Sequence, residues 1–162
     1  MGQHHEMSGR ARDSIRQASA ADAEQLVGLW ASVFGDEPTR PSRWKKHAHE
    51  WFMRMVEDPV SACFPVAEFD GSVVATAIGT LELGVPNPEC PRGRTVRLAN
   101  VVTLPMHRGK GYGTQLVLTV VEWARSINAD RVDLSATPDG RRIYERVGFT
   151  TTRAPRMKLP LW

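Results

Sequence analysis

A glycine-rich stretch with two cations, Arg108 to Gly113 in the sequence RGKGYG, has the residue types of an anion-binding loop. Glycine lacks a Cβ, so peptide N–H groups beside it can approach a ligand closely. An apolar run precedes the loop and a helix-like pattern follows it. The first amides of a helix have no partner inside the helix, and its dipole makes that end partly positive. The junction therefore predicts a cradle for a diphosphate, built from backbone donors.

The loop differs from two familiar phosphate motifs. The P-loop pattern G-x-x-x-x-G-K-[ST] is absent, and the dinucleotide fingerprint G-x-G-x-x-G has a wider last spacing. Arg108 and Lys110 would add positive charge, and Thr114 would add a hydroxyl donor. A simple turn requires one or two glycines, so the alternation of Gly109, Gly111 and Gly113 favours the cradle over a solvated turn.

The elements before the loop alternate between helical and strand patterns. A short strand is predicted at 14–19, and Ser19 with Asp22 would cap the helix that follows. A second helix is predicted after Ser42, which would cap it beyond the loop at 35–42. The apolar faces of the two helices comprise Leu26, Leu29, Trp30 and Val33, then Trp44, Ala48, Trp51, Phe52 and Met55. Strands follow at 63–69, 72–83 and 94–104, the first two joined by a hairpin turn at Asp70-Gly71.

Behind the loop the pattern predicts a helix, a strand at 131–137, a short helix at 140–147 and two C-terminal strands at 148–153 and 156–161. The apolar face of the first of these helices comprises Leu116, Val120, Trp123, Ala124 and Ile127. This order predicts an α/β (α+β) domain with a mixed six- or seven-stranded central sheet flanked by about four helices.

Two segments resemble the GNAT superfamily of acyl-CoA-dependent N-acetyltransferases. RGKGYG resembles that family's R/Q-x-x-G-x-G/A pyrophosphate loop, and NVVTLP resembles the strand before it. LSATPDGRRIYERVGF resembles the downstream strand, short helix and Y-E-x-x-G-F segment. The element order agrees from about Ser14 to the end. Both motifs in the same order make the resemblance specific.

The resemblance implies that acetyl-CoA is the acyl-donor co-substrate. It implies that Val101, Val102 and Thr103 offer backbone groups to the acetyl and pantetheine portions, and that Tyr144 is the general acid. The residues that it assigns to the pyrophosphate are Arg108, Gly109, Lys110, Gly111, Tyr112, Gly113 and Thr114. One position departs from the family: many members carry asparagine seven residues before the tyrosine, where this chain has Thr137.

Direct acetyl transfer requires a neutral amine, a donor for the developing oxyanion and a proton for the departing thiolate. A phenol with a pKa near 10 can donate to a thiolate whose acid has a pKa near 8.5. An amide near Val102 would serve the oxyanion where the strand diverges from its neighbour, and Pro105 ends that strand. The general base has three candidates: Glu82, Asp133, or a water held by Asn100 or Ser135.

Composition limits the other classes of function. The chain has 21 basic and 18 acidic residues, an excess too small to predict nucleic-acid binding. HEWFM is not the H-E-x-x-H zinc motif, and Cys63 and Cys90 form no C-x-x-C pair, so no metal is expected. The sequence contains no apolar run of 18 or more residues, so no membrane span is predicted. Residues 1–13 are predicted to be a disordered or tag-like tail, and 14–162 the acetyltransferase-like domain, in the cytoplasm.

The first functional hypothesis is an N-acetyltransferase that moves the acetyl group of acetyl-CoA to a primary amine by direct attack in a ternary complex. The alternative is a non-catalytic acyl-CoA-binding or sensing module. The acceptor amine is not identified by the sequence. Arg92, Arg94 and Arg97 are interpreted as a charged edge rather than a clamp for an acidic acceptor. The resemblance also admits a homodimer.

Overall fold

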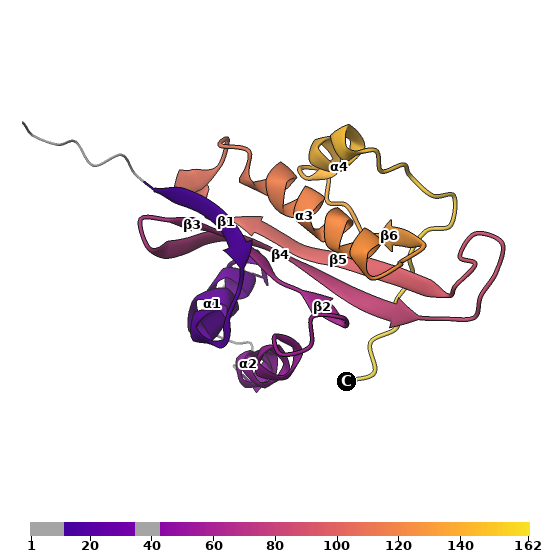
Figure 1. Ribbon diagram of the computed structural model, residues 1–162, viewed down its shortest axis with the longest axis horizontal. Coiled ribbons are helices and arrows are strands. Elements are labelled where there is room, and N and C mark those ends of the chain that lie inside the picture. Colours follow the sequence, from indigo (N-terminus) through magenta and orange to yellow (C-terminus); the bar gives the residue numbers. More distant parts are fainter. Residues whose placement is uncertain (1–11, 35–42) are drawn as a thin grey trace, which may run out of the picture.

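A mixed six-stranded sheet runs through the molecule, with helices on both faces (Figure 1). The computed structural model describes residues 12–34 and 43–162. The strands are β1 (Asp13–Gln17), β2 (Ala62–Cys63), β3 (Pro65–Phe69), β4 (Ser72–Leu83), β5 (Arg94–Thr103) and β6 (Arg131–Asp133). The α-helices are α1 (Ala23–Phe34), α2 (Arg43–Met55), α3 (Tyr112–Ser126) and α4 (Arg141–Val147), with 3₁₀ turns at Ala20–Asp22 and Pro105–His107.

The sheet order is β1-β3-β4-β5-β6, and β2 pairs with β4 beside β3. All pairs are antiparallel except β5 with β6, which α3 connects as a crossover. Figure 1 shows α1 and α2 on one face of the sheet and α3 and α4 on the other. The predicted fold class is thereby confirmed, with six strands and four α-helices in the described residues.

The β3–β4 hairpin closes through a two-residue turn. Asp70 has φ 47° and Gly71 has φ 82°, the left-handed pair that suits the twist of a tight hairpin. The predicted hairpin at Asp70-Gly71 is therefore confirmed.

On the adjoining strand, Arg16 of β1 donates hydrogen bonds to Asp22 at 2.8 and 2.9 Å and to Glu68 of β3 at 2.7 Å. These bonds tie the start of α1 to the edge of the sheet.

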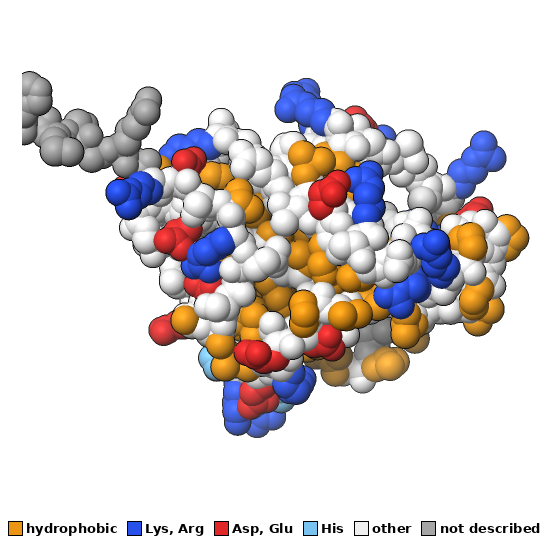
Figure 2. All heavy atoms as spheres, viewed as in Figure 1, with side chains coloured by type: hydrophobic (Ala, Val, Ile, Leu, Met, Phe, Trp, Pro, Cys, Tyr) orange, Lys and Arg blue, Asp and Glu red, His pale blue; other side chains and the backbone are white. Residues whose placement is uncertain are grey.

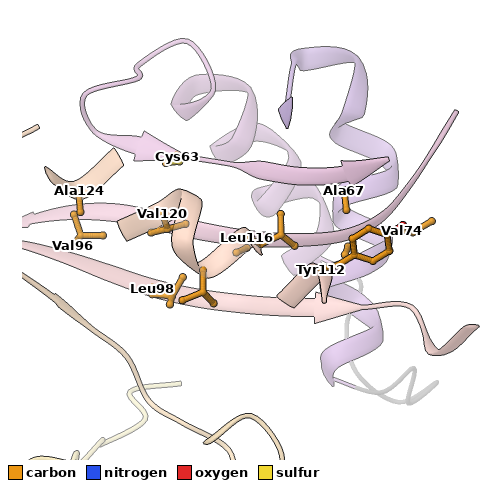
Figure 3. Packing of buried hydrophobic residues seen from close by; sticks show 12 residues of the cluster. Cys63, Ala67, Val74, Val96, Leu98, Tyr112, Leu116, Val120 and Ala124 are labelled. Atoms are coloured by element: carbon orange, nitrogen blue, oxygen red, sulfur yellow. The ribbon is translucent and has the colours of Figure 1, made fainter. Parts of the chain in front are cut away.

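Each face of the sheet carries its own apolar core. Beneath α1 and α2 the buried residues include Leu26, Trp30 and Phe52, which confirms most of the predicted helix faces. Val33 was expected on this face, but it lies at the exposed end of α1. On the other face α3 packs Leu116 and Val120 against the strands, as Figure 3 shows.

Gly79 of β4 is required for this packing, because a Cβ there would lie 2.7 Å from a methyl carbon of Val120 and 3.1 Å from the Trp123 ring. Trp123 is further held by a hydrogen bond from Nε1 to the Pro59 carbonyl at 2.7 Å. The close approach of α3 to the sheet is what sets the position of the glycine loop that precedes it.

The C-terminal strands predicted at 148–153 and 156–161 are wrong. Residues 149–162 form neither helix nor strand, and the sixth strand is instead the short β2. The strand predicted at 131–137 shortens to Arg131–Asp133. An alternating sequence does not by itself provide a neighbouring strand to pair with. In addition, Pro155 and Pro160 each lack the backbone N–H that a strand ladder needs. The predicted Ser42 cap, the loop at 35–42 and most of the predicted tail at 1–13 lie outside the described residues.

Candidate active site

The glycine loop joins the Pro105–His107 turn to α3. Gly109 has φ 77° and Gly111 has φ 83°, a left-handed conformation that costs glycine little. The first helical bond at this end runs from the Gln115 amide to the Gly111 carbonyl at 3.2 Å. Within the part of the chain that the structure describes, the amides of 109–114 donate no hydrogen bond. Consecutive free donors at a helix N-terminus form a site for an anion.

The third glycine of the loop has a different role from the other two. A Cβ on Gly113 would lie 3.1 Å from the Ile143 side chain of α4, so this glycine allows α3 and α4 to pack closely. Nothing lies within 4 Å of a Cβ built on Gly109, and that side of the loop is open. The alternation therefore combines two conformational glycines with one packing glycine.

The cations of the loop are positioned by neighbouring groups. Arg108 donates from Nε to the Thr103 carbonyl at 3.1 Å, and Lys110 holds its Nζ 4.4 Å from the centre of the Phe69 ring. Both side chains are exposed, so they can move to a phosphate at low cost. Tyr112 is buried, and its hydroxyl lies 3.5 Å from an Asp13 carboxylate oxygen. Because its side chain is buried, Tyr112 can contribute to the cradle only through its backbone amide.

Strand β5 is paired on one edge and largely open on the other. Toward β4 it pairs along its whole length, with a bulge where Asn100 and Val101 lie opposite Ala77. Asn100 takes φ 50° at this bulge. Toward β6 it pairs only over Thr95–Arg97. The two parallel strands therefore diverge beside the glycine loop and leave backbone groups of β5 without a strand partner.

The direction of the free groups follows from the alternation of the strand. The Leu104 amide donates to the Val74 carbonyl of β4 at 2.9 Å. Amides alternate in direction along a strand, so that of Val102 also faces β4. The amides that face the opening are those of its neighbours, Val101 and Thr103.

Tyr144 lies on α4, in the layer that packs against α3. Its ring packs edge-on against Phe149 with centroids 6.0 Å apart, and a Cβ on Gly140 would lie 3.1 Å from the same ring. Burial raises the pKa of the Tyr144 phenol above its ordinary value of 10.0, so the group is protonated at neutral pH. The hydroxyl makes no hydrogen bond within residues 12–34 and 43–162, so its proton is available to a ligand.

Similarity to known proteins identifies the family of this chain. The family model described as "Acetyltransferase (GNAT) family" matches residues 21–149. The chain belongs to the GNAT acetyltransferase family.

Similar proteins include one from Bacillus subtilis and several of known structure. The B. subtilis "uncharacterized N-acetyltransferase YobR" is 36% identical over 56 residues, which are 33% of this chain and 23% of that protein. A predicted acetyltransferase from Clostridium acetobutylicum, solved with acetyl-CoA, has a TM-score of 0.81 and 25% identity, covering 93% of this chain and 97% of its own. The aminoglycoside N-acetyltransferase AAC(6')-Iy, solved with CoA, has a TM-score of 0.75 at 18% identity, covering 96% and 99% of the two chains. This last likeness concerns the fold alone.

The candidate bases of this GNAT protein are engaged with cations. Glu82 pairs with Arg97 at 3.2 Å, and Asp133 lies 3.3 Å from Arg131. The Ser135 hydroxyl accepts from Arg156 at 3.1 Å. Asn100 and Ser135 were the two residues predicted to hold a water. Of these, Asn100 is the one whose side chain makes no hydrogen bond within the described residues.

The cluster of arginines at the start of β5 contacts the end of α3. Arg94 donates from Nε and Nη2 to the Ile127 carbonyl at 3.2 and 2.8 Å, and Arg92 donates to the Asn128 carbonyl at 3.5 Å. Cations at a helix C-terminus satisfy its last carbonyls and complement the dipole. These contacts favour the charged-edge interpretation over an acceptor clamp.

The contacts that Phe69 makes with the glycine loop are not predicted by the sequence. This residue ends β3, and its ring contacts Lys110 on the glycine loop and His107, whose ring centroid is 5.0 Å away. The His107 Nδ1 atom is buried and has no hydrogen-bond partner in the described residues. An aromatic residue before a hairpin turn gives no local signal for such a role, because the contact joins segments far apart in sequence. Among the described residues, no group of three or more metal-ligating side chains lies together.

No helix of the described residues is long and apolar enough to cross a membrane.

Proposed function

We propose that this GNAT protein transfers the acetyl group of acetyl-CoA to a primary amine by direct attack in a ternary complex. The observation that carries the proposal is the run of free amides at 109–114, beside the point where β5 and β6 diverge. The acetyl-CoA bound to the C. acetobutylicum relative supports the choice of co-substrate. Both buried cysteines are free, which fits a reducing compartment such as the cytoplasm.

The diphosphate of the co-substrate is assigned to the loop. The free amides of Gly109 to Thr114 would donate to its oxygens, and the partly positive end of α3 would favour its charge. Arg108 and Lys110 would exchange their present contacts, with the Thr103 carbonyl and the Phe69 ring, for phosphate oxygens. The Thr114 hydroxyl is a further donor at the same end of the helix.

The pantetheine arm is assigned to the open edge of β5. An extended amide chain can bond to a free strand edge as another strand would. The amides of Val101 and Thr103 face this opening, so we assign them as donors to the thioester carbonyl of a bound co-substrate. A fixed amide stabilises the oxyanion that develops as the amine attacks. Val102 supports the arrangement through its pairing with Thr76 of β4.

Tyr144 is assigned the role of donor to the departing sulfur. The ordinary pKa of a phenol already exceeds that of a thiol, and burial raises the pKa of Tyr144 further, so complete proton transfer is uphill. Hydrogen-bond donation to the thiolate needs no complete transfer, and it lowers the barrier as charge accumulates on sulfur. With Glu82 and Asp133 in ion pairs, we assign removal of the amine proton to a water beside Asn100.

The test is the variant Tyr144→Phe, assayed for thioester turnover by release of free thiol with a panel of amines. Loss of the hydroxyl is expected to reduce turnover about 100-fold, within the usual range for an acid–base group. Calorimetry is expected to give an unchanged affinity for CoA, because the cradle is untouched. Unchanged turnover would remove Tyr144 from the mechanism. CoA binding without turnover of any amine by the unmutated protein would favour the acyl-CoA-sensing module.

A further inference from the structure

A hollow of about 670 Å³ lies at the end of β6, between the segment 132–138, the start of α4 and residues from 149 to 156. Arg97 of β5 lines it from the neighbouring strand. Its volume is that of a site for a small molecule. Figure 2 shows Lys and Arg side chains (blue) on the side of the view where Figure 1 places α4, β6 and the segment that follows α4.

The hollow reaches the layer that contains Tyr144. Phe149 lines the hollow, and its ring packs against the Tyr144 ring. Thr137 lines it too, and a Cβ built on Gly140 would lie 3.4 Å from Thr137 Oγ1 and 3.6 Å from Tyr144 Cζ. Because Cζ carries the phenol oxygen, a molecule in the hollow lies close to the group that we assign to the departing sulfur.

The charged side chains of the hollow are three arginines and two acids, and one of the arginines has no acidic partner. The other four are in ion pairs: Arg97 with Glu82, Arg141 with Glu145, and Asp133 with Arg131. Arg156 donates from Nη1 to the Ser135 hydroxyl at 3.1 Å and makes no ion pair within residues 12–34 and 43–162. A guanidinium presents paired N–H donors that match a carboxylate or a phosphate.

Hydroxyl groups around this arginine also have protons to donate. The Ser135, Thr137 and Thr151 hydroxyls accept hydrogen bonds from Arg156, the Gly140 amide and Arg141, respectively. None of these three hydroxyls donates a hydrogen bond within the part of the chain that the structure describes. Each therefore keeps its own proton for a ligand. Free donors on both walls, beside carboxylates that are already paired, favour an oxyanion in the hollow.

We propose that the hollow binds a carboxylate or phosphate group of the acceptor, so that the acceptor is a small amine that also carries a negative charge. This assignment rests on the proposed function for the reaction itself. Arg156 would contact the anion, and the Ser135 hydroxyl would donate to it. The Cα atoms of Ser135 and Thr137 are at most about 7 Å apart, because they are two residues apart. An acceptor with several bonds between its anion and its amine can therefore reach both Arg156 and the neighbourhood of Tyr144.

The first test compares acceptors of matched length on the full chain with acetyl-CoA. The series are ω-amino acids, aminoalkyl phosphates, amino alcohols and diamines, and release of free thiol gives kcat/KM for each. One of the two anionic series is expected to exceed the amino alcohols by about 10–100-fold, the range for hydrogen bonds to a charged group. Which of the two it is identifies the oxyanion. Equal kcat/KM for anionic and neutral acceptors, or a preference for diamines, would overturn the proposal.

Variants of Arg156 test the residue that carries the assignment. Arg156→Ala is expected to lower kcat/KM for the anionic acceptor to that of the amino alcohol of the same length. Arg156→Lys is expected to keep part of the preference, because it retains the charge without the paired donors. Arg153→Ala is the matched control: Arg153 is an exposed arginine of the same segment that does not line the hollow, so the preference should persist. A preference that survives Arg156→Ala would contradict the site.

A binding measurement separates the anion site from acetyl transfer. CoA carries no acetyl group, so calorimetry on the CoA complex measures acceptor affinity without reaction. The wild-type complex is expected to bind the anionic acceptor about 10–100-fold more tightly than the Arg156→Ala complex. Turnover without an anionic preference would overturn the anion site and leave acetyl transfer standing. Binding that depends on Arg156, without turnover of any amine, would do the reverse, and the absence of both would overturn both proposals.

Discussion

Two parts of the molecule differ in how completely their polar groups are hydrogen-bonded. In the part formed by β1, β3 and α1, Arg16 joins Asp22 and Glu68 in a network with contacts of 2.7–2.9 Å, and Asp22 also accepts from the Ser19 amide. In the part formed by β5, α3 and α4, the amides of 109–114 and the Tyr144 hydroxyl have no partner among the described residues. The first part satisfies its polar groups internally, and the second has free donors at the position that we propose for the ligand.

We call the part formed by β1, β3 and α1 the scaffold, and the part formed by β5, α3 and α4 the candidate site. Polar groups that are fully bonded hold the fold, whereas fixed donors left free are available at no cost in broken protein bonds. One atom departs from the rule: Trp30 Nε1 is buried in the scaffold without a partner, and nothing in the structure explains it. Substitutions in the scaffold should therefore change stability with little effect on CoA affinity, and changes in the site should do the reverse.

The largest effect is expected for Leu26→Ala in the core beneath α1. Leu26 is completely buried, and truncating such a leucine costs about 2–5 kcal/mol of unfolding free energy because a cavity remains. Urea denaturation measures this loss, and the exposed Leu83→Ala serves as the control with a small change. The folded fraction should retain wild-type CoA affinity in calorimetry. A large loss of affinity would show that the scaffold and the site are coupled.

An intermediate effect is expected for Asp22→Asn. The hydrogen bond from Arg16 lowers the pKa of Asp22, and the change removes the charge that this bond requires. We expect a loss of about 1–2 kcal/mol near neutral pH, reduced from a fully buried pair because Arg16 is partly exposed.

The pH dependence of the same variant gives the sharper measurement. A depressed folded pKa stabilises the protein at pH values above the unfolded pKa of about 3.9, and this stability is lost as pH falls toward the folded pKa. Wild-type and Asp22→Asn proteins should therefore converge in stability under acid. The exposed Glu24→Gln is the control for removing one acid from α1. A constant difference between the two proteins down to pH about 2 would contradict this assignment.

The smallest change in stability is expected for two matched glycines. Gly71 and Gly109 have φ 82° and 77°, and a Cβ on either would meet nothing within 4 Å. Ala at either position should cost about 1 kcal/mol through backbone strain alone. Only Gly109→Ala should also weaken CoA binding, by about tenfold or 1.4 kcal/mol, because it disturbs the free amides. Equal affinity in the two variants would argue against the loop as the diphosphate site.

Much of the fold was predictable because its signals are local. The Asp70-Gly71 turn, the apolar stripe of α3 and the Ser19–Asp22 cap each depend on residues close in sequence, and the structure contains all three. The C-terminal strands were mispredicted for the converse reason. Residues 156–161 have the alternation of a strand, but a strand also requires an edge to pair with, and these residues pair with no strand in the structure.

The site was predictable in kind but not in detail. The glycine loop and Tyr144 were named from the sequence, and their assigned roles remain proposals. The packing function of Gly113 depends on Ile143, which lies 30 residues later in the sequence. The orientation that turns Val101 and Thr103 toward the opening depends on the register of β5 against β4. Neither fact has a local signal.

The sequence by itself indicated the family, most of the order of the elements and the glycine loop that we propose as the diphosphate site, because glycine spacing and apolar periodicity act through neighbouring residues. The tertiary structure decided which donors are free: the divergence of β5 from β6, the orientation of amides along β5 and the burial of Tyr144 arise only when distant segments pack. A hydrogen-bonding group becomes functional when the fold leaves it unpaired, and pairing is a property of the whole chain.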